Sequence, residues 1–189
     1  MKNIAFLISF LLLFTFGYAQ KPPMPKATPP SKPMLKDGKP QQVASPLDSS
    51  SVTTSDGVKI TIRYGSPSLR GRELGVDILK PGERWRTGAN ETTTVEFDKN
   101  VTVNGQQLSA GKYGLNTIPG EQSSTLIFNK NWKQWGTKFD EKEDVLKVEV
   151  PNERKSESQE RLTITADESG KIHLAWGTYG LSLAIKADQ

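Results

Sequence analysis

Apolar and polar residues alternate with a period of two through most of the chain from residue 51 onward. This period places every apolar side chain of a strand on one face. The apolar members of the pattern are Val58, Ile60, Ile62, Tyr64, Val95, Phe97, Leu146, Val148, Val150, Leu162, Ile164, Ile172, Leu174, Trp176, Leu181, Leu183 and Ile185. No segment sustains the 3.6-residue period of a helix, so the sequence predicts an all-β domain whose strands each bury one face.

Turn signals separate these predicted strands. Asn104-Gly105 is typical of a type I′ hairpin turn, in which both central residues take positive φ. Gly57 and Gly170 indicate two further hairpin-like turns. Residues 69–80 are compatible with a helical turn, although two glycines in the segment weaken that prediction.

We count nine or ten candidate strands in the part of the chain that alternates. The pattern indicates an antiparallel β-sandwich over residues 47–189, of jelly-roll or immunoglobulin-like order. Alternation does not choose between those strand orders. The length suits one domain preceded by a tail.

Residues 1–19 have the pattern of a secretory signal peptide. Lys2 supplies a positive start, an apolar run of 13 residues follows, and Gly17 and Ala19 are small residues at the −3 and −1 positions. A transmembrane helix needs roughly 20 apolar residues. We therefore expect export, with cleavage after Ala19 and no membrane span in the mature chain. An uncleaved anchor is the alternative. The expected location is the periplasm, the outer membrane or the outside of the cell.

Residues 20–46 hold eight of the chain's twelve prolines and five lysines against one aspartate. Such a composition buries too little apolar surface to fold, so we predict a disordered, Pro/Lys-rich linker. A basic tether to an acidic envelope polymer is the functional alternative. Residues 47–189 contain 19 basic and 20 acidic residues, so the isoelectric point of about 9.2 comes largely from the tail. We expect no nucleic-acid partner, because such binding needs clustered basic residues.

The residue inventory excludes several kinds of site. The chain has no cysteine and one histidine, which rules out disulfides, thiolate chemistry and a multi-histidine zinc site. No phosphate-binding glycine loop or dinucleotide fingerprint is present, and we expect no cofactor and no metal. His173 has no recognisable nucleophile motif to act with. The acidic run 140–144 lacks the spacing of a calcium loop and is predicted to be a solvated loop.

The run WRTGANETTT, residues 85–94, concentrates chemistry in few positions. Trp85 offers an indole face for stacking, and Arg86 offers a planar fork of donors. Asn90 both donates and accepts, and Glu91 supplies a carboxylate. These four residues are candidates for a ligand-binding pocket wall. The structural alternative is that Arg86 pairs with Glu91 inside the fold while Asn90 caps a turn.

A second cluster, residues 129–139, places Trp132 and Trp135 three residues apart among three lysines. The functional interpretation is an aromatic and basic loop that covers a pocket or binds a glycan or a protein partner. The structural alternative is that both indoles plug one end of the sandwich, since large exposed apolar patches are uncommon on monomers.

Several separated motifs occur in an order that resembles an uncharacterised family of exported bacterial proteins, domain-of-unknown-function family 2911. The motifs are GR at 71–72, WRTGAN at 85–90, AGKY at 110–113, IPG at 118–120, NKNWKQWG at 129–136, DVL at 144–146, ERLTI at 160–164 and LAW at 174–176. The resemblance covers roughly residues 47–187. It implies an exported β-domain and directs attention to residues 85–91, but it supplies no catalytic residues.

The sequence therefore predicts an exported, non-catalytic β-sandwich of the cell envelope that binds a small ligand, a glycan or a protein partner. A structural or assembly protein without a small ligand is the first alternative. A carbohydrate-active hydrolase is the second, with Glu91 acting beside Glu96, Asp98 or Glu121. Such an enzyme needs two carboxyl groups about 5–9.5 Å apart.

Overall fold

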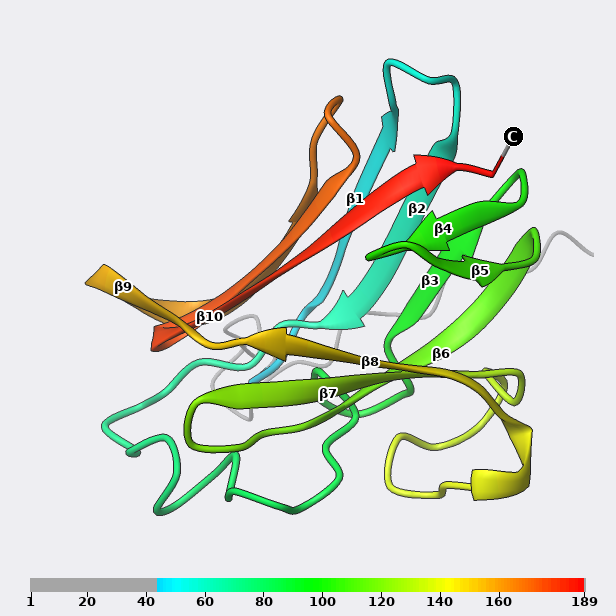
Figure 1. Ribbon diagram of the computed structural model, residues 1–189. Coiled ribbons are helices and arrows are strands. Elements are labelled where there is room, and N and C mark those ends of the chain that lie inside the picture. The colour runs from blue at the N-terminus through cyan, green and yellow to red at the C-terminus, as the bar shows by residue number, and fades with distance from the viewer. Residues whose placement is uncertain (1–43, 189) are drawn as a thin grey trace, which may run out of the picture. The chain divides into compact units, whose positions relative to one another are not determined.

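The computed structural model describes residues 44–188, and these form two antiparallel β-sheets packed face to face (Figure 1). The predicted signal peptide, residues 1–19, and residues 20–43 of the predicted linker lie outside the described residues. The strands are β1 (Leu47–Thr53), β2 (Lys59–Gly65), β3 (Thr94–Phe97), β4 (Val101–Val103), β5 (Gln106–Leu108), β6 (Gly111–Ile118), β7 (Ser123–Asn129), β8 (Asp144–Pro151), β9 (Glu153–Ala166) and β10 (Lys171–Ala187). One 3-10 turn, η1 (Glu141–Glu143), precedes β8.

The larger sheet has the order β1-β2-β3-β6-β7-β8, and the smaller sheet has the order β5-β4-β10-β9. All paired strands are antiparallel. The predicted all-β antiparallel sandwich is thus confirmed, and the structure supplies the strand order that alternation left open. The chain passes between the sheets after β3, β5 and β8, which leaves β2, β3 and β6 as neighbours in the larger sheet.

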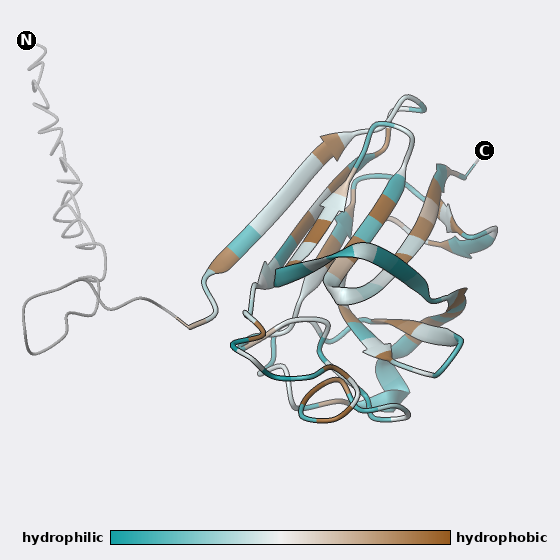
Figure 2. Ribbon diagram, turned by 90° about the vertical axis from the view of Figure 1, so that its left-hand side faces the viewer, coloured by the Kyte–Doolittle hydropathy of each residue, from teal (hydrophilic) through white to brown (hydrophobic). Residues whose placement is uncertain are grey.

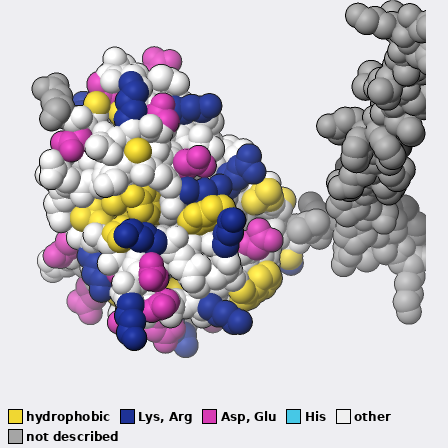
Figure 3. Space-filling model, turned by 90° about the vertical axis from the view of Figure 1, so that its right-hand side faces the viewer, with side chains coloured by type: hydrophobic (Ala, Val, Ile, Leu, Met, Phe, Trp, Pro, Cys, Tyr) yellow, Lys and Arg dark blue, Asp and Glu magenta, His cyan; other side chains and the backbone are white. Residues whose placement is uncertain are grey.

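The core lies between the two sheets and contains every residue of the alternating pattern except Leu146, which packs against it. Figure 2 shows hydrophobic and hydrophilic bands that alternate along the strands. The aromatic rings of Phe97 and Tyr113 both pack against Phe128, at centroid distances of 6.4 Å. Offset and edge-to-face contacts of this kind stabilise a core beyond the area that they bury. On the face seen in Figure 3, Lys and Arg side chains are scattered among acidic ones.

The predicted hairpin turns are confirmed. Asn104 and Gly105 have φ values of 48° and 83° and join β4 to β5 as a type I′ turn requires. Gly57 and Gly170 also take positive φ, in the β1–β2 and β9–β10 connections. Residues 69–80, which the sequence left compatible with a helical turn, form no regular helix but contain one turn of helical spacing, in which the Asp77 N–H donates to the Glu73 carbonyl at 3.0 Å.

Strand β10 doubles back on itself, and Figure 1 shows its orange first part descending and its red last part ascending. The backbone N–H of Ile185 donates to the carbonyl of Gly170 at 2.8 Å, which brings the two ends of β10 together. The reversal occurs near Gly177, whose φ is 58°. The first part pairs with β9 and the last part with β4. This agrees with the two separate apolar runs in the sequence, 172–176 and 181–185.

The described part of the chain offers no helix with the length and apolar character that a bilayer crossing requires.

Candidate functional site

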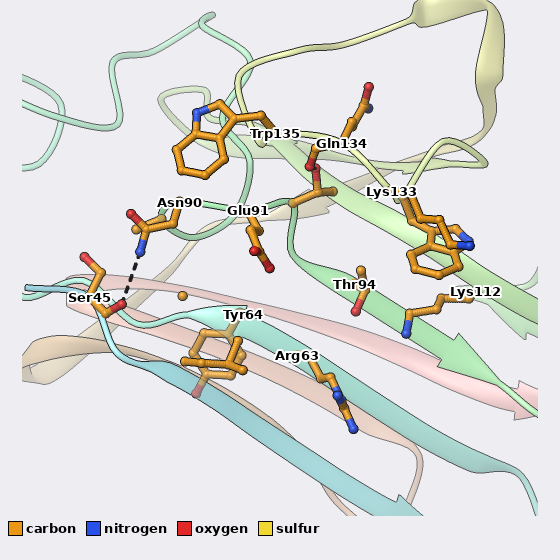
Figure 4. A pocket seen from close by; sticks show the side chains of 15 residues that line it. Ser45, Arg63, Tyr64, Asn90, Glu91, Thr94, Lys112, Lys133, Gln134 and Trp135 are labelled. Carbon is orange, nitrogen blue, oxygen red and sulfur yellow. Dashed lines mark hydrogen bonds between the residues drawn. The ribbon is translucent and has the colours of Figure 1, made fainter. Parts of the chain in front are cut away.

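A groove of about 780 Å³ lies on the outer face of the larger sheet, where β2, β3 and β6 form its floor (Figure 4). Thr94 of β3 lies directly across from Arg63 of β2, and Lys112 of β6 lies across from Glu96. These residues alternate with core residues and therefore point away from the core. The groove is lined by Ser45, Leu47, Arg63, Tyr64, Gly65, Ala89, Asn90, Glu91, Thr92, Thr94, Lys112, Trp132, Lys133, Gln134 and Trp135.

Two loops form the walls of the groove and are bonded to each other. The backbone of Glu91 forms an isolated antiparallel bridge with Trp135. The hydroxyl of Thr92 donates to the carbonyl of Gln134 at 2.9 Å, and the Gly136 N–H donates to the carbonyl of Asn90 at 3.2 Å. Two segments separated by some 40 residues, both singled out by the sequence, therefore meet along one side of the sheet.

The first half of the WRTGAN run points inward and belongs to the fold. Trp85 does not line the groove; its indole stacks on that of Trp176, with ring centroids 5.7 Å apart and planes 17° apart. The Trp85 backbone exchanges two 2.8 Å hydrogen bonds with Thr117. The indole N–H donates to the carbonyl of Gly88 at 3.0 Å. Trp85 thus fixes the base of the loop and does not contact the groove.

Gly88 marks a close approach between this loop and the end of β2. A Cβ on Gly88 would lie 2.5 Å from Thr93 Oγ1 and 3.1 Å from the carbonyl oxygen of Gly65. A Cβ on Gly65 would in turn lie 2.1 Å from the carbonyl oxygen of Ala89. Since real Cβ atoms do not approach so closely, glycine is required at both positions. This contact fixes where the loop tip, Asn90 and Glu91, stands above the sheet.

Arg86 does not line the groove. Its guanidinium Nη1 donates to the carbonyl of Asn90 at 3.0 Å, and its aliphatic stem packs against Gly136. Half-burial of the guanidinium lowers the pKa of Arg86. No ion pair joins Arg86 to Glu91 within the described residues, so the pairing that the structural alternative assumed is not present there. Arg86 acts as a clamp between the two loops.

The tip of the run faces the groove. Asn90 has a left-handed backbone, with φ of 66°, and its Nδ2 donates to the carbonyl of Ser45 at 3.2 Å. Glu91 is exposed, and Figure 4 shows its carboxylate directed into the groove between the sheet and Trp135. The WRTGAN run therefore has a structural base, and the residue that follows it, Glu91, directs its carboxylate into the groove.

Trp132 and Trp135 both line the groove, although they differ in burial. Trp135 is 53% exposed, which is unusual for an indole. Trp132 is half-buried, and the ammonium groups of Lys112 and Lys133 lie 4.6 and 4.9 Å from its ring centroid. Cation–π contacts of this geometry hold the lysines beside the ring. The two indoles do not plug the end of the sandwich, as the structural alternative supposed.

A buried polar network anchors the tryptophan loop. The side chain of Asn129 donates to the carbonyl of Asp140 and to the Asp144 carboxylate, and so closes the loop at its base. The guanidinium of Arg84 forms a two-point ion pair with Asp144 at 2.7 and 3.0 Å. It also donates twice to the Asn116 side-chain oxygen. Burial raises the pKa of Asp144, but its hydrogen bonds and the charge of Arg84 outweigh burial and lower it.

The solvated loop predicted for residues 140–144 is therefore wrong at its last position. The Asp144 side chain is 4% exposed and its partner Arg84 is 11% exposed. This pair could not be predicted from sequence patterns, because the two residues are far apart in the chain and each stands in a charged, turn-like stretch. Proximity of β6, β7 and β8 is what brings the network together.

The paired carboxylates of the hydrolase alternative are not assembled in the groove. Glu91 is the one carboxylate among the described residues that line it. Glu121 lines a separate cavity of about 610 Å³, and Asp98 accepts a hydrogen bond from the Lys59 N–H. Glu96 lies 3.6 Å from the Lys112 ammonium. Within residues 44–188 no group of three or more histidine, aspartate or glutamate side chains is arranged to hold a metal ion.

His173 has partners that the sequence did not reveal. Its Nδ1 lies 3.1 Å from the hydroxyl of Ser182, and its Nε2 lies 3.2 Å from a carboxylate oxygen of Asp167. The reversal of β10 brings Ser182 across from His173. Neither of the two cavities described here includes these residues, and Asp167 also bonds Ser169 and Lys171 at the turn. These contacts join the first part of β10 to its last part and to the β9–β10 turn.

Comparison with known proteins confirms the family that the sequence resembles. Residues 45–185 match a protein family described as a protein of unknown function, DUF2911. No curated protein and no solved structure matches the chain. The matched region begins just before β1 and ends within β10, so it includes both sheets and both groove loops. Because the match covers most of the chain, this protein belongs to the DUF2911 family.

Proposed function

We propose that this domain is a non-catalytic binding module that holds a ligand in the groove on the outer face of its larger sheet. The observation that carries the proposal is Trp135, an indole 53% exposed on the wall of a 780 Å³ groove. An exposed indole on the wall of a concave site offers a ligand apolar surface whose burial is favourable. Binding sites for small molecules combine such aromatic walls with a few converging polar groups.

The groove is also largely preformed. Its floor is a hydrogen-bonded sheet, and its two walls are bonded to each other through Thr92 and Gly136. The network of Arg84, Asn129 and Asp144 anchors the second wall from below. A preorganised site loses little conformational entropy when a ligand binds, which favours affinity.

We further propose that the module acts outside the cytoplasm, in the cell envelope or beyond it. Residues 1–19 support this proposal because they have the pattern of a signal peptide. The chain has no cysteine, so its stability comes from the packed core and not from disulfides. Mass spectrometry of the protein recovered from its native host tests this. Cleavage after Ala19 is expected, and a cytoplasmic chain that retains Met1–Ala19 contradicts it.

Binding is tested by titrating the purified protein with a panel of oligosaccharides and small metabolites. Tryptophan fluorescence and calorimetry detect the binding. The informative variant is Trp135→Ala, which removes the exposed indole. Its matched control is Val76→Ala, because Val76 is 60% exposed and does not line the groove. We expect Trp135→Ala to abolish binding while both variants keep the wild-type melting temperature. Binding that survives Trp135→Ala places the site elsewhere, and a panel without binders favours the structural or assembly alternative.

A further inference from the structure

The groove has an excess of positive charge that the domain as a whole does not share. Its lining contains the basic residues Arg63, Lys112 and Lys133 and one acidic residue, Glu91. Residues 47–189 together are close to neutral, with 19 basic and 20 acidic residues. Clustered charge of one sign in a concave site with low-dielectric walls raises the local concentration of oppositely charged ligands.

Two of these cations have no carboxylate partner within the described residues. Arg63 is exposed on β2 and takes part in none of the ion pairs there. Lys133 contacts the face of Trp132 at 4.9 Å but forms no ion pair there either. Lys112 is shared between the same indole, at 4.6 Å, and Glu96, at 3.6 Å. Arg63 and Lys133 are therefore available to a ligand, whereas Lys112 is shared with Glu96.

The register of the sheet sets the length over which a ligand must extend. Arg63 is paired with Thr94, and Lys112 is paired with Glu96, two residues farther along β3. From two strand spacings and two residues of rise, the Cα atoms of Arg63 and Lys112 lie about 12 Å apart on one face. This span favours an elongated ligand with several negative groups over a single small anion, because one anion would have to draw both long side chains together.

The remaining groups in the groove suit sugar rings. The exposed indole of Trp135 provides a flat apolar face, against which the C–H face of a pyranose packs, while Trp132 holds Lys112 and Lys133 over its ring. The carboxylate of Glu91 accepts hydrogen bonds from hydroxyls, and the amide of Gln134 both donates and accepts. An aromatic wall, a hydroxyl acceptor and spaced cations in one groove match an oligosaccharide that bears negative groups.

We infer that the ligand of this groove is an acidic oligosaccharide, with a sugar ring against Trp135 and its negative groups on Arg63 and on the two lysines that Trp132 holds, Lys112 and Lys133. This inference rests on the proposed function, because it names the ligand class of the same site. The negative groups are carboxylates or sulfates, which guanidinium and ammonium groups both recognise.

The test compares two probes of matched length by calorimetry: a tetramer of galacturonate and the same tetramer with its carboxyl groups reduced to the neutral sugar. A sulfated tetramer in a third arm distinguishes sulfate from carboxylate. The variants are Arg63→Gln and Lys133→Gln, with Lys171→Gln as the control, because Lys171 is exposed and lies outside the groove. A charge-assisted hydrogen bond contributes enough to change affinity by about tenfold or more.

We expect an acidic tetramer to bind at least about tenfold more tightly than the neutral one, with affinity that falls as salt rises. Each groove variant should weaken acidic binding by about tenfold, and Lys171→Gln should leave it unchanged. Equal binding of acidic and neutral tetramers, with loss in Trp135→Ala, overturns the charge inference and leaves the proposed function standing. Acidic binding that Lys171→Gln weakens as much as Arg63→Gln overturns the inference as nonspecific attraction. Failure of both tetramers, together with Trp135-dependent binding of a panel member that is not a saccharide, overturns the saccharide class and leaves the proposed function standing.

Discussion

Replacing Arg84 with methionine removes the charge from the buried network beneath the groove while keeping an apolar stem of similar length. The wild-type guanidinium makes two bonds to Asp144 and two to Asn116, and its face lies 4.8 Å from the ring centroid of Phe139. In Arg84→Met the Asp144 carboxylate stays buried without its main counter-ion. Removing one partner of a buried ion pair costs about 3–5 kcal/mol.

The lower end of that range applies here. Asp144 retains a 2.7 Å hydrogen bond from Asn129, and the Lys147 ammonium lies 3.4 Å away. We therefore expect the free energy of unfolding to fall by about 3 kcal/mol. For a domain of this size the melting temperature should fall by about 6–12 °C.

Urea unfolding followed by fluorescence and circular dichroism measures this loss. The control is Arg70→Met, because Arg70 is exposed and its side chain makes no hydrogen bond within the described residues. The pH dependence gives a second check. The pKa of Asp144 is lowered in the folded state, so its stabilising effect is present above the unfolded pKa and is lost as pH falls. The gap between wild type and Arg84→Met should therefore shrink below about pH 4. A loss under about 1 kcal/mol at pH 7, close to that of Arg70→Met, refutes the reasoning.

Three further predictions concern the groove wall and the core. Gly88→Ala should destabilise the fold by about 1–3 kcal/mol in urea unfolding, because the new Cβ meets Thr93 Oγ1; an unchanged midpoint contradicts the close approach. Tyr64→Phe should cost about 1–3 kcal/mol, since it leaves the buried Ile164 N–H without its 3.0 Å acceptor; a neutral result means that another acceptor replaces it. Burial raises the pKa of Tyr64 and of Tyr179 to about 12, so stability should fall between about pH 10 and 12 as the unfolded tyrosines ionise, and less steeply in either Phe variant.

The fold was predictable because its determinants are local in sequence. Alternation along the strands depends only on neighbouring residues. The β4–β5 turn is likewise local, because Asn104 and Gly105 are the two residues that take its positive φ values. Strand order was not predictable, since it depends on which strands pair across long separations. The 3-10 turn and the irregular segment 69–80 were also beyond reach, because short turns depend on contacts with the rest of the domain.

The residue types of the candidate site were predictable from the sequence. Which of the predicted residues line the groove together was less predictable. Asn90, Glu91, Trp132 and Trp135 meet in one groove, but Trp85 turns inward to Trp176 and Arg86 clamps the loops without lining the groove. Sequence patterns do not say which side of a loop faces the core. Sequence analysis missed two residues on the sheet floor, Arg63 and Lys112. Each is a polar residue of an alternating strand, and nothing in the pattern distinguishes it from the others. Their common face follows from strand order and register.

The central claim, that the groove is a binding site, is tested most directly by the indole N–H signals of the four tryptophans in a nuclear magnetic resonance titration. The chain carries two groove indoles, Trp132 and Trp135, and two stacked core indoles, Trp85 and Trp176, which serve as internal controls. Single substitutions assign the four signals, and the protein is then titrated with the acidic and the neutral tetrasaccharide. The signals of Trp132 and Trp135 should shift with the acidic ligand. Those of Trp85 and Trp176 should stay in place. Saturable binding that leaves Trp132 and Trp135 unshifted contradicts the account.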